Sequence, residues 1–241
     1  MDQWQPDINI VLTGTIVPNA SFTVINDPSR RRQEYLDAIK YYSQFAPVHF
    51  LENSRHELSN DADFRSSDRV TIQQFPVSLF ARKGKGYQEF EMLDSWVSSN
   101  KNPPRRWVKI TGRYIVRNIS EILADCRRAE SYPFVIDLCG RSKIARTHLF
   151  YAETDSYRNY LLDSYRACND ESGDWIERVL FKKIRGWDEL RTRTFSLEPN
   201  VTAVSGSTGA SHDSSIVKYK INSILRAVNN LFDKQCLWYA K

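Results

Sequence analysis

The sequence of 241 residues contains no apolar run near the roughly 20 residues that cross a bilayer. Its first residues, MDQWQPDINIVL, show no basic segment followed by an apolar run of signal-peptide length. The cysteines form no CxxC pair, which argues against a zinc ribbon and favours a reducing compartment. We therefore expect a cytoplasmic protein, in contact at most with the inner face of the cytoplasmic membrane. The cysteines are Cys126, Cys139, Cys168 and Cys236.

The motifs of several enzyme classes are also missing. There is no GxxxxGK[ST] phosphate loop, no GxGxxG fingerprint and no GxSxG nucleophile elbow. The four histidines are scattered, and no His/Cys cluster has metal-ligand spacing. The one Asp-x-Asp string, Asp61-Ala62-Asp63, lies in a polar segment that we expect to be loop. No metal ligand can be named, so the need for a divalent metal stays open.

The overall composition is that of a soluble globular protein with a basic balance. Hydrophobic residues make up 41% of the chain and charged residues 26%, which gives enough apolar side chain for a core. Lysine and arginine number 34 against 29 acidic residues, a formal charge of +5. This balance favours an anionic ligand or surface without choosing among them.

The order of apolar segments predicts an α/β fold. Short apolar runs alternate with segments of helical period, a pattern typical of a mainly parallel central sheet flanked by helices. Asp27 followed by Pro28 is a helix start, and Pro47 stops that helix. We expect one domain over residues 1–241, with a nucleotide-binding part at about 1–140 and an acceptor-side part at about 141–241. The expected strands are 8–14, 48–54, 69–75, 107–111, 134–139 and 146–151, and the expected helices are 28–46, 86–97, 118–128, 157–167, 175–184 and 216–232.

Polar residues follow several of the expected strands. In a parallel α/β sheet, ligands bind beyond the carboxyl ends of the strands. We therefore expect these residues to contact a nucleotide. They are Thr13, Gly14, Thr15, Glu52, Asn53, Thr111, Gly112 and Asp137.

Two basic, glycine-containing segments point to a phosphate ligand. In RKGKGYQE, Lys83 and Lys85 alternate with glycines at a helix start, which suits a diphosphate, although a solvated turn has the same composition. We place Lys83, Lys85, Gly86 and Glu89 in the donor site. In KITGRY, Lys109 and Arg113 alternate along a strand, so both can face one anion, or both can be surface side chains of an edge strand. We expect Arg113 to stabilise a leaving diphosphate where a metal would otherwise act.

Carboxylates are the candidates for a general base. Glu177 begins a predicted helix, and Glu153 follows the strand that contains His148. Either can deprotonate a hydroxyl within hydrogen-bond reach, and either can be a helix-capping or surface residue instead. The segment SGSTG, residues 205–209, is a mobile lid, a phosphate loop or a flexible connection.

At these residues the chain resembles a family of bacterial GT-A-type glycosyltransferases from capsule and O-antigen gene clusters. The matching segments are TGT at 13–15, FLENS at 50–54, GKGYQE at 84–89 and KITGRY at 109–114, followed by Asn118. The resemblance implies a single GT-A-like, Rossmann-like domain for polysaccharide biosynthesis. It implies transfer of a sugar from a nucleotide-sugar donor to a saccharide acceptor, which can be lipid-linked, at the inner membrane face. This chain departs from common GT-A enzymes in lacking Asp-x-Asp at the expected strand end.

Two other functions remain open. A nucleotidyltransferase acting on a sugar phosphate also needs a nucleotide-phosphate site, although it normally uses paired carboxylates for metals. A nucleic-acid-binding module is suggested by Arg30-Arg31-Arg32 and by the segment PRRW at 104–107. The basic residues are dispersed, however, and no RNP or zinc-finger pattern is present, so we expect no nucleic-acid partner.

The last predicted helix, residues 216–232, is amphipathic. Its cations Lys218, Lys220 and Arg226 stand among isoleucines, leucines and valines. We expect this helix to pack on the domain and to present a basic edge to anionic lipid, with packing alone as the alternative.

Overall fold

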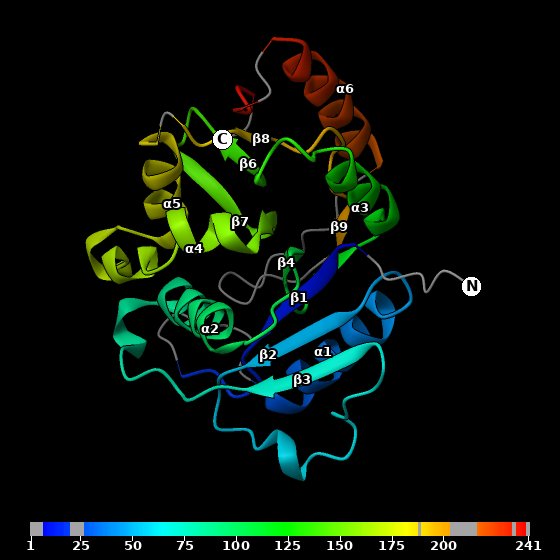
Figure 1. Cartoon of the computed structure of the whole chain (residues 1–241), viewed down its shortest axis with the longest axis vertical. Helices are drawn as coiled ribbons and strands as arrows, with labels where there is room; N and C mark the ends of the chain where they lie inside the picture. The colour runs from blue at the N-terminus through cyan, green and yellow to red at the C-terminus, as the bar shows by residue number, and fades with distance from the viewer. Residues whose placement is uncertain (1–6, 20–26, 188, 203–215, 233–234, 240–241) are drawn as a thin grey trace.

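The computed structural model describes residues 7–19, 27–187, 189–202, 216–232 and 235–239. Within them a seven-stranded sheet has the order β3-β2-β1-β4-β7-β6-β8 (Figure 1). All neighbouring pairs are parallel except those that involve β7, which runs opposite to β4 and β6. The predicted α/β fold with a mainly parallel central sheet is confirmed. The strands are β1 (Asn9–Gly14), β2 (Val48–Glu52), β3 (Val70–Gln74), β4 (Arg106–Thr111), β6 (Phe134–Cys139), β7 (Ile144–Glu153) and β8 (Thr192–Arg193).

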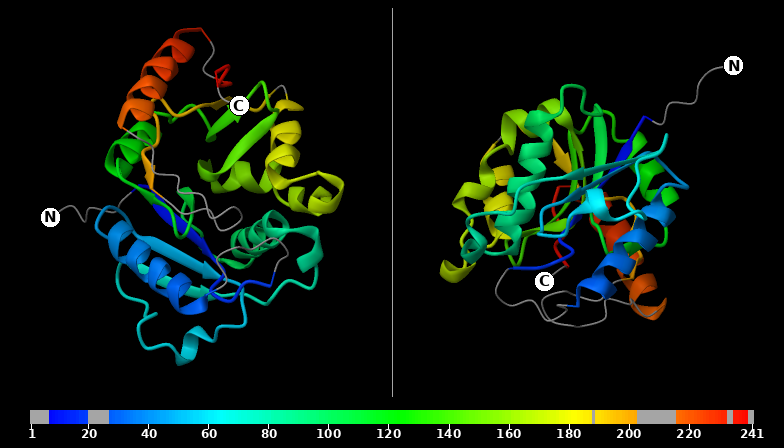
Figure 2. Two further views of the ribbon diagram at one scale, coloured as in Figure 1. Left: turned by 180° about the vertical axis from the view of Figure 1, so that it is seen from behind. Right: turned by 90° about the horizontal axis from the view of Figure 1, so that it is seen from below.

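Helices cover both faces of this sheet (Figure 2). One apolar cluster joins α1 and α3 to one face, and a second joins α2, α4 and α5 to the other. A small second sheet pairs β5 (Ile115–Val116) with β9 (Val201–Thr202). None of the described helices combines the length and apolar character that a membrane crossing requires. The helices are α1 (Pro28–Tyr42), α2 (Lys85–Ser99), α3 (Ile119–Arg127), α4 (Thr154–Tyr160), α5 (Ile176–Arg185) and α6 (Ile216–Phe232).

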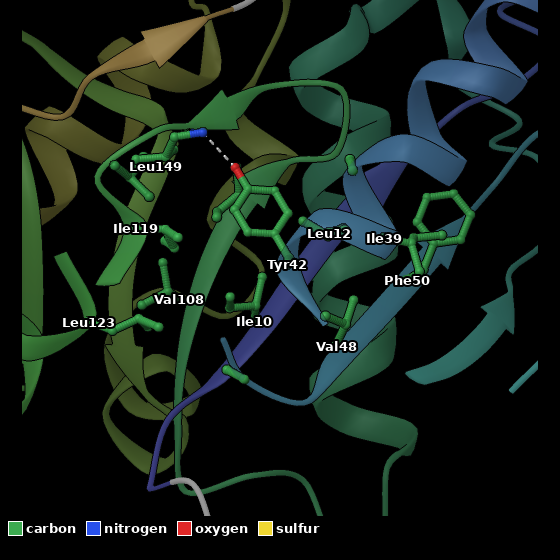
Figure 3. Close-up of a cluster of buried hydrophobic side chains, with 14 of the residues drawn as sticks. Ile10, Leu12, Ile39, Tyr42, Val48, Phe50, Val108, Ile119, Leu123 and Leu149 are labelled. Atoms are coloured by element: carbon green, nitrogen blue, oxygen red, sulfur yellow. Dashed lines mark hydrogen bonds between the residues drawn. The ribbon is translucent and has the colours of Figure 1, made fainter. Parts of the chain in front are cut away.

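The first cluster ties α1 to the strand ends that carry the polar residues. Alternate side chains of β1 and β2, such as Leu12 and Phe50, meet Ile39 and Tyr42 of α1 (Figure 3). The Tyr42 hydroxyl accepts a hydrogen bond from the Val116 backbone N–H at 2.8 Å and donates to the Tyr114 carbonyl at 2.7 Å. These bonds fix the chain just after β4 against α1, so Arg113, the residue before Tyr114, has a defined position.

The sheet draws strands from both of the parts expected from the sequence, since β7 lies between β4 and β6. The division at about residue 140 into nucleotide-binding and acceptor-side parts stays a prediction.

Candidate functional site

A cavity of about 230 Å³ opens where β1 and β4 end. Walls from α1, α2, β7 and α5 complete it, so its lining comes from chain segments far apart in sequence. The position is the one at which parallel α/β sheets bind ligands. The lining residues that the sequence had indicated are Thr13, Gly14, Thr15, Lys85, Gly86, Glu89, Thr111, Arg113 and Glu177.

The glycine of TGRY is explained by close packing. The Gly112 N–H donates to the Thr13 carbonyl at 2.9 Å. A Cβ atom at position 112 would lie 2.8 Å from that carbonyl oxygen and 3.2 Å from the Tyr35 ring. Only glycine lets the turn after β4 lie this close to β1 and α1. The close approach is to the protein's own backbone, and it places the next residue, Arg113, in the cavity wall.

Three cationic side chains from three different elements line the cavity: Arg31 of α1, Lys85 at the start of α2, and Arg113 after β4. Burial lowers the pKa of Arg31; the neighbouring Tyr35 opposes this, and the charge of Arg113 lowers it further. Burial lowers the pKa of Lys85 to about 8, and Arg31 and Arg113 contribute to that shift. The three positive charges therefore repel one another inside the cavity, and a bound anion would reduce this repulsion.

Hydrogen bonds hold the two arginines in place. The Arg31 Nε donates to the Thr15 carbonyl at 2.7 Å, and its Nη2 donates to the Tyr35 hydroxyl at 3.0 Å. Arg113 forms an ion pair with Glu34, with 2.7 Å between Nη1 and Oε2. Each guanidinium is thus fixed on one side by protein contacts, so both are preorganised as hydrogen-bond donors.

Lys109 supports the cavity from behind. Its side chain is fully buried, and its Nζ lies 2.6 Å from Glu89 Oε1 and 2.9 Å from the Thr147 carbonyl. The same Glu89 oxygen accepts hydrogen bonds from the hydroxyls of Thr13 and Thr111. The role expected for Lys109 therefore changes: it is not among the lining residues, and it neutralises and positions Glu89.

Glu177 faces the cavity from the first turn of α5 and accepts a hydrogen bond from the Thr147 hydroxyl at 3.3 Å. Burial raises the pKa of Glu177, and the negative charge of Glu89 also raises it. The cavity lining therefore includes two acidic side chains, Glu89 and Glu177, in addition to its three cations. Carboxylate oxygens of this kind accept hydrogen bonds from hydroxyl groups.

Glu52 and Asn53 form a layer beneath the cavity. Glu52 accepts hydrogen bonds from the backbone N–H groups of Ile16 and Ser54, each at 2.9 Å. Asn53 accepts from the Thr15 hydroxyl at 2.7 Å and donates to the Gln88 carbonyl at 3.1 Å. Neither lines the cavity, and both fix the segment after β1 that does.

Three residues expected at the site lie elsewhere. The Lys83 ammonium stands over the Tyr87 ring, 4.9 Å from its centre, and Lys83 is not among the lining residues. Glu153 pairs in the sheet with Arg106, the first residue of β4, so it lies at the opposite end of that strand from Thr111. Asp137 is buried in an ion pair with Arg226, with 2.7 Å between oxygen and nitrogen. The structure thus places neither Glu153 as a base nor Asp137 as a ligand at this cavity.

Two segments were predicted to be loops, the Asp61-Ala62-Asp63 string and the SGSTG segment. Asp61 and Asp63 pair with Arg32 in the segment after β2, in agreement with the loop expected there. The SGSTG segment, 205–209, lies outside the described residues. Among the residues that the structure does describe, no group of three or more His, Cys, Asp or Glu is arranged to hold a metal ion.

Several lining residues were missed by sequence reasoning. Arg31 and Tyr35 are spaced i, i+4 on α1, and this face points into the cavity instead of only into the core. The triple arginine had suggested a nucleic-acid surface, but its middle residue is buried at 6% exposure. Tyr114 and His148 line another part of the cavity with their ring centres 5.8 Å apart. Only the three-dimensional arrangement brings these residues together.

Comparisons with known proteins give fold likenesses only. The sequence matches no family model and no curated protein. A Bacillus anthracis protein assigned as a glucose-1-phosphate thymidylyltransferase is 13% identical, with a TM-score of 0.45 over 91% of this chain and 94% of that one. The 4-diphosphocytidyl-2C-methyl-D-erythritol synthase of Anaerococcus prevotii is 8% identical, with a TM-score of 0.44 over 90% and 96%. Rv0371c of Mycobacterium tuberculosis is 9% identical, with a TM-score of 0.44 over 78% and 88%.

The glycosyltransferase function expected from the sequence is corrected by these comparisons. One of the similar structures is named as a thymidylyltransferase and another as a 4-diphosphocytidyl-2C-methyl-D-erythritol synthase, and none of the three is named as a glycosyltransferase. The resemblance to the surface-polysaccharide family stays a prediction. Identities of 8 to 13% describe the fold alone.

Proposed function

We propose that the protein is a nucleotidyltransferase that uses this cavity to join a nucleoside triphosphate to a sugar phosphate, yielding a nucleotide sugar. The observation that carries the proposal is the convergence of Arg31, Lys85 and Arg113 on one cavity at the carboxyl end of a parallel sheet. Three mutually repelling cations are stabilised by a multiply charged anion, and a triphosphate supplies that charge.

The reaction needs little chemistry from the protein. A phosphate oxygen of the sugar phosphate attacks the α-phosphorus, a new P–O bond forms, and the bond to the β-phosphate oxygen breaks to release pyrophosphate. The attacking phosphate is already ionised at neutral pH, so no base is required. Catalysis then depends on positioning and on neutralising the charge that develops on the leaving pyrophosphate.

The two acidic residues of the lining have a separate role in this proposal. Glu89, held by Lys109, and Glu177, held by Thr147, can accept hydrogen bonds from ribose or sugar hydroxyls. Mg²⁺ is commonly bound by one or two carboxylates together with substrate phosphates, and these are the carboxylates that the described lining offers. A metal bound there would neutralise phosphate charge alongside the three cations.

Calorimetric titration tests the binding step. A nucleoside triphosphate is expected to bind at least about 100-fold more tightly than its nucleoside, because two charge-assisted hydrogen bonds at about 1.5 kcal/mol each correspond to that ratio. Titrations with UTP, dTTP, CTP and ATP, with and without Mg²⁺, also show which nucleobase the site prefers. Equal affinities for nucleotide and nucleoside would remove phosphate as the principal contact and with it the proposal.

The pH dependence of this binding is expected to follow Lys85. Its pKa of about 8 means that the ammonium is charged at pH 7 and largely neutral at pH 9.5. Triphosphate affinity should therefore fall as the pH rises through about 8, and binding near that pH should take up a proton. In Lys85→Arg the charge persists, so the decline should disappear. A wild-type affinity that is constant from pH 7 to 9.5 would show that Lys85 does not contact the anion.

A further inference from the structure

Helix α6 turns two polar side chains, Arg226 and Asn229, into the protein. Arg226 is fully buried, and its guanidinium donates to both oxygens of Asp137 at 2.7 and 2.8 Å and to Glu198 Oε2 at 2.7 and 2.9 Å. Asn229, also fully buried, accepts from the Trp238 backbone N–H at 3.0 Å. The helix bounds predicted from the sequence are confirmed. The prediction that Arg226 lies on an outward basic edge was wrong, because this residue points inward and holds the helix on the domain.

The outward side of the same helix is apolar. Its side chains recur three, seven, ten and eleven residues after the first, so they form one stripe along the helix. Their exposed fractions lie between 38% for Val228 and 83% for Phe232. Figures 1 and 2 show α6 at the outer edge of the molecule. The stripe consists of Ile221, Ile224, Val228, Leu231 and Phe232.

This orientation is the reverse of that of an ordinary surface helix, which buries its apolar stripe and exposes its polar side. A contiguous row of large exposed apolar side chains marks a contact surface. The inward polar network shows that the orientation is set by specific bonds: turning the helix over would leave Asp137 and Glu198 buried without Arg226. The stripe is therefore held outward by the fold itself.

The charge of α6 and of the whole chain favours an anionic partner for the stripe. The sequence of residues 216–232 contains three cations and no aspartate or glutamate, and the whole chain carries a formal charge of +5. Arg226 is neutralised by its inward ion pairs, so in a symmetric dimer the exposed Lys220 of each copy would meet a helix that carries no acidic residue. An anionic lipid surface supplies both an apolar layer for the stripe and negative charge for exposed Lys220. We propose that α6 docks the protein on anionic membranes through this stripe, independently of the catalytic cavity.

The test is cosedimentation of the whole protein with vesicles at low salt. Vesicles of phosphatidylcholine with phosphatidylserine should retain wild-type protein, whereas pure phosphatidylcholine should retain at least about tenfold less. Leu231→Glu places a charge in the stripe and should weaken binding about tenfold or more. Leu79→Glu is the matched control, since Leu79 is 92% exposed but belongs to another surface, and its binding should equal that of the wild type.

Three outcomes would overturn the membrane proposal. One is the absence of wild-type cosedimentation with anionic vesicles, and another is equal loss of binding in the two leucine variants. The third is a wild-type dimer by light scattering that Leu231→Glu dissociates and Leu79→Glu does not, which would assign the stripe to a second copy of the chain. Melting temperatures of both variants within a few degrees of the wild type show that the fold is retained, because both leucines are exposed.

Discussion

Arg226→Ala is expected to lower the free energy of unfolding by about 3–5 kcal/mol, because it removes the cation that bonds two buried carboxylates, Asp137 and Glu198, and leaves them with the more distant Arg146, at 3.8 and 4.0 Å. For a chain of this size the melting temperature should fall by roughly 6–20 °C. Burial alone raises the pKa of Asp137, but the Arg226 guanidinium, with smaller contributions from Arg146 and the Phe195 backbone N–H, outweighs burial and holds the pKa below its usual value. Without Arg226 the carboxyl group takes up a proton more readily.

This stability contribution has a defined pH dependence. Because the pKa of Asp137 is lowered in the folded protein, the stabilisation is present above the unfolded pKa and is lost as the pH falls through the folded one. The difference between wild type and Arg226→Ala should therefore shrink in acid. Lys220→Ala, on the exposed side of the same helix, is the control and should change stability by less than about 0.5 kcal/mol. A loss below about 1 kcal/mol in Arg226→Ala at pH 7 would show that the buried network is not what holds α6.

Arg113→Ala is expected to lower the turnover number about 10²–10³-fold, the typical cost of removing one preorganised donor to the charge that develops in the transition state. The fold should persist, since the turn is positioned by Gly112 and by the bonds around Tyr42. Arg113→Lys should recover only part of the rate, because an ammonium lacks the planar guanidinium fork. The measurement is steady-state pyrophosphate release from a nucleoside triphosphate with a sugar phosphate present.

Arg30→Ala provides the matched control for Arg113. Arg30 pairs with the same carboxylate, Glu34, at 3.0 Å, but from the surface and outside the cavity lining. If Arg113 acts on the substrate, only its own replacement reduces turnover. If it acts only by neutralising Glu34, both variants should lose activity to a similar extent, and the electrostatic role given to Arg113 would be wrong.

Local signals in the sequence predicted most of the secondary structure. Asp27 before Pro28 marks the start of α1, and its side chain accepts from the Ser29 N–H at 3.0 Å. The segment from Phe134 to Cys139 is a fully buried strand with the predicted bounds. These features depend on neighbouring residues, so a single sequence reveals them.

The direction of β7 could not be predicted in this way. The sequence predicts a strand at 146–151, but nothing local says that it runs against β4. Had it been parallel, its carboxyl end would have met the cavity and Glu153 could have served as a base. The reversed direction places Glu153 beside Arg106 instead, which is why a reasonable candidate from the sequence falls outside the site.

Charge pairing explains why two other residues that were predicted to bind the ligand lie outside the cavity lining. Lys109 was expected at the anion from its place in KITGRY, and Asp137 from its place near a strand end, yet Glu89 neutralises the first and Arg226 the second. Their partners lie 20 and 89 positions away along the chain, beyond the reach of a pattern in one segment. Arg31 is the opposite case, a lining residue that was not predicted. Its place in a run of three arginines suggested a surface residue, whereas its side chain is buried and bonded to Tyr35 and the Thr15 carbonyl.

The most direct test of nucleotidyl transfer follows the phosphorus. Nucleoside triphosphates labelled at the α- or γ-phosphate are incubated with sugar 1-phosphates and Mg²⁺, and the products are separated by chromatography. The proposed reaction predicts that the α-label enters a nucleotide sugar while the γ-label leaves as pyrophosphate, in equal amounts, and that Arg113→Ala loses both. If no triphosphate yields pyrophosphate, while a nucleotide sugar incubated with a saccharide acceptor releases its nucleoside diphosphate, nucleotidyl transfer is contradicted.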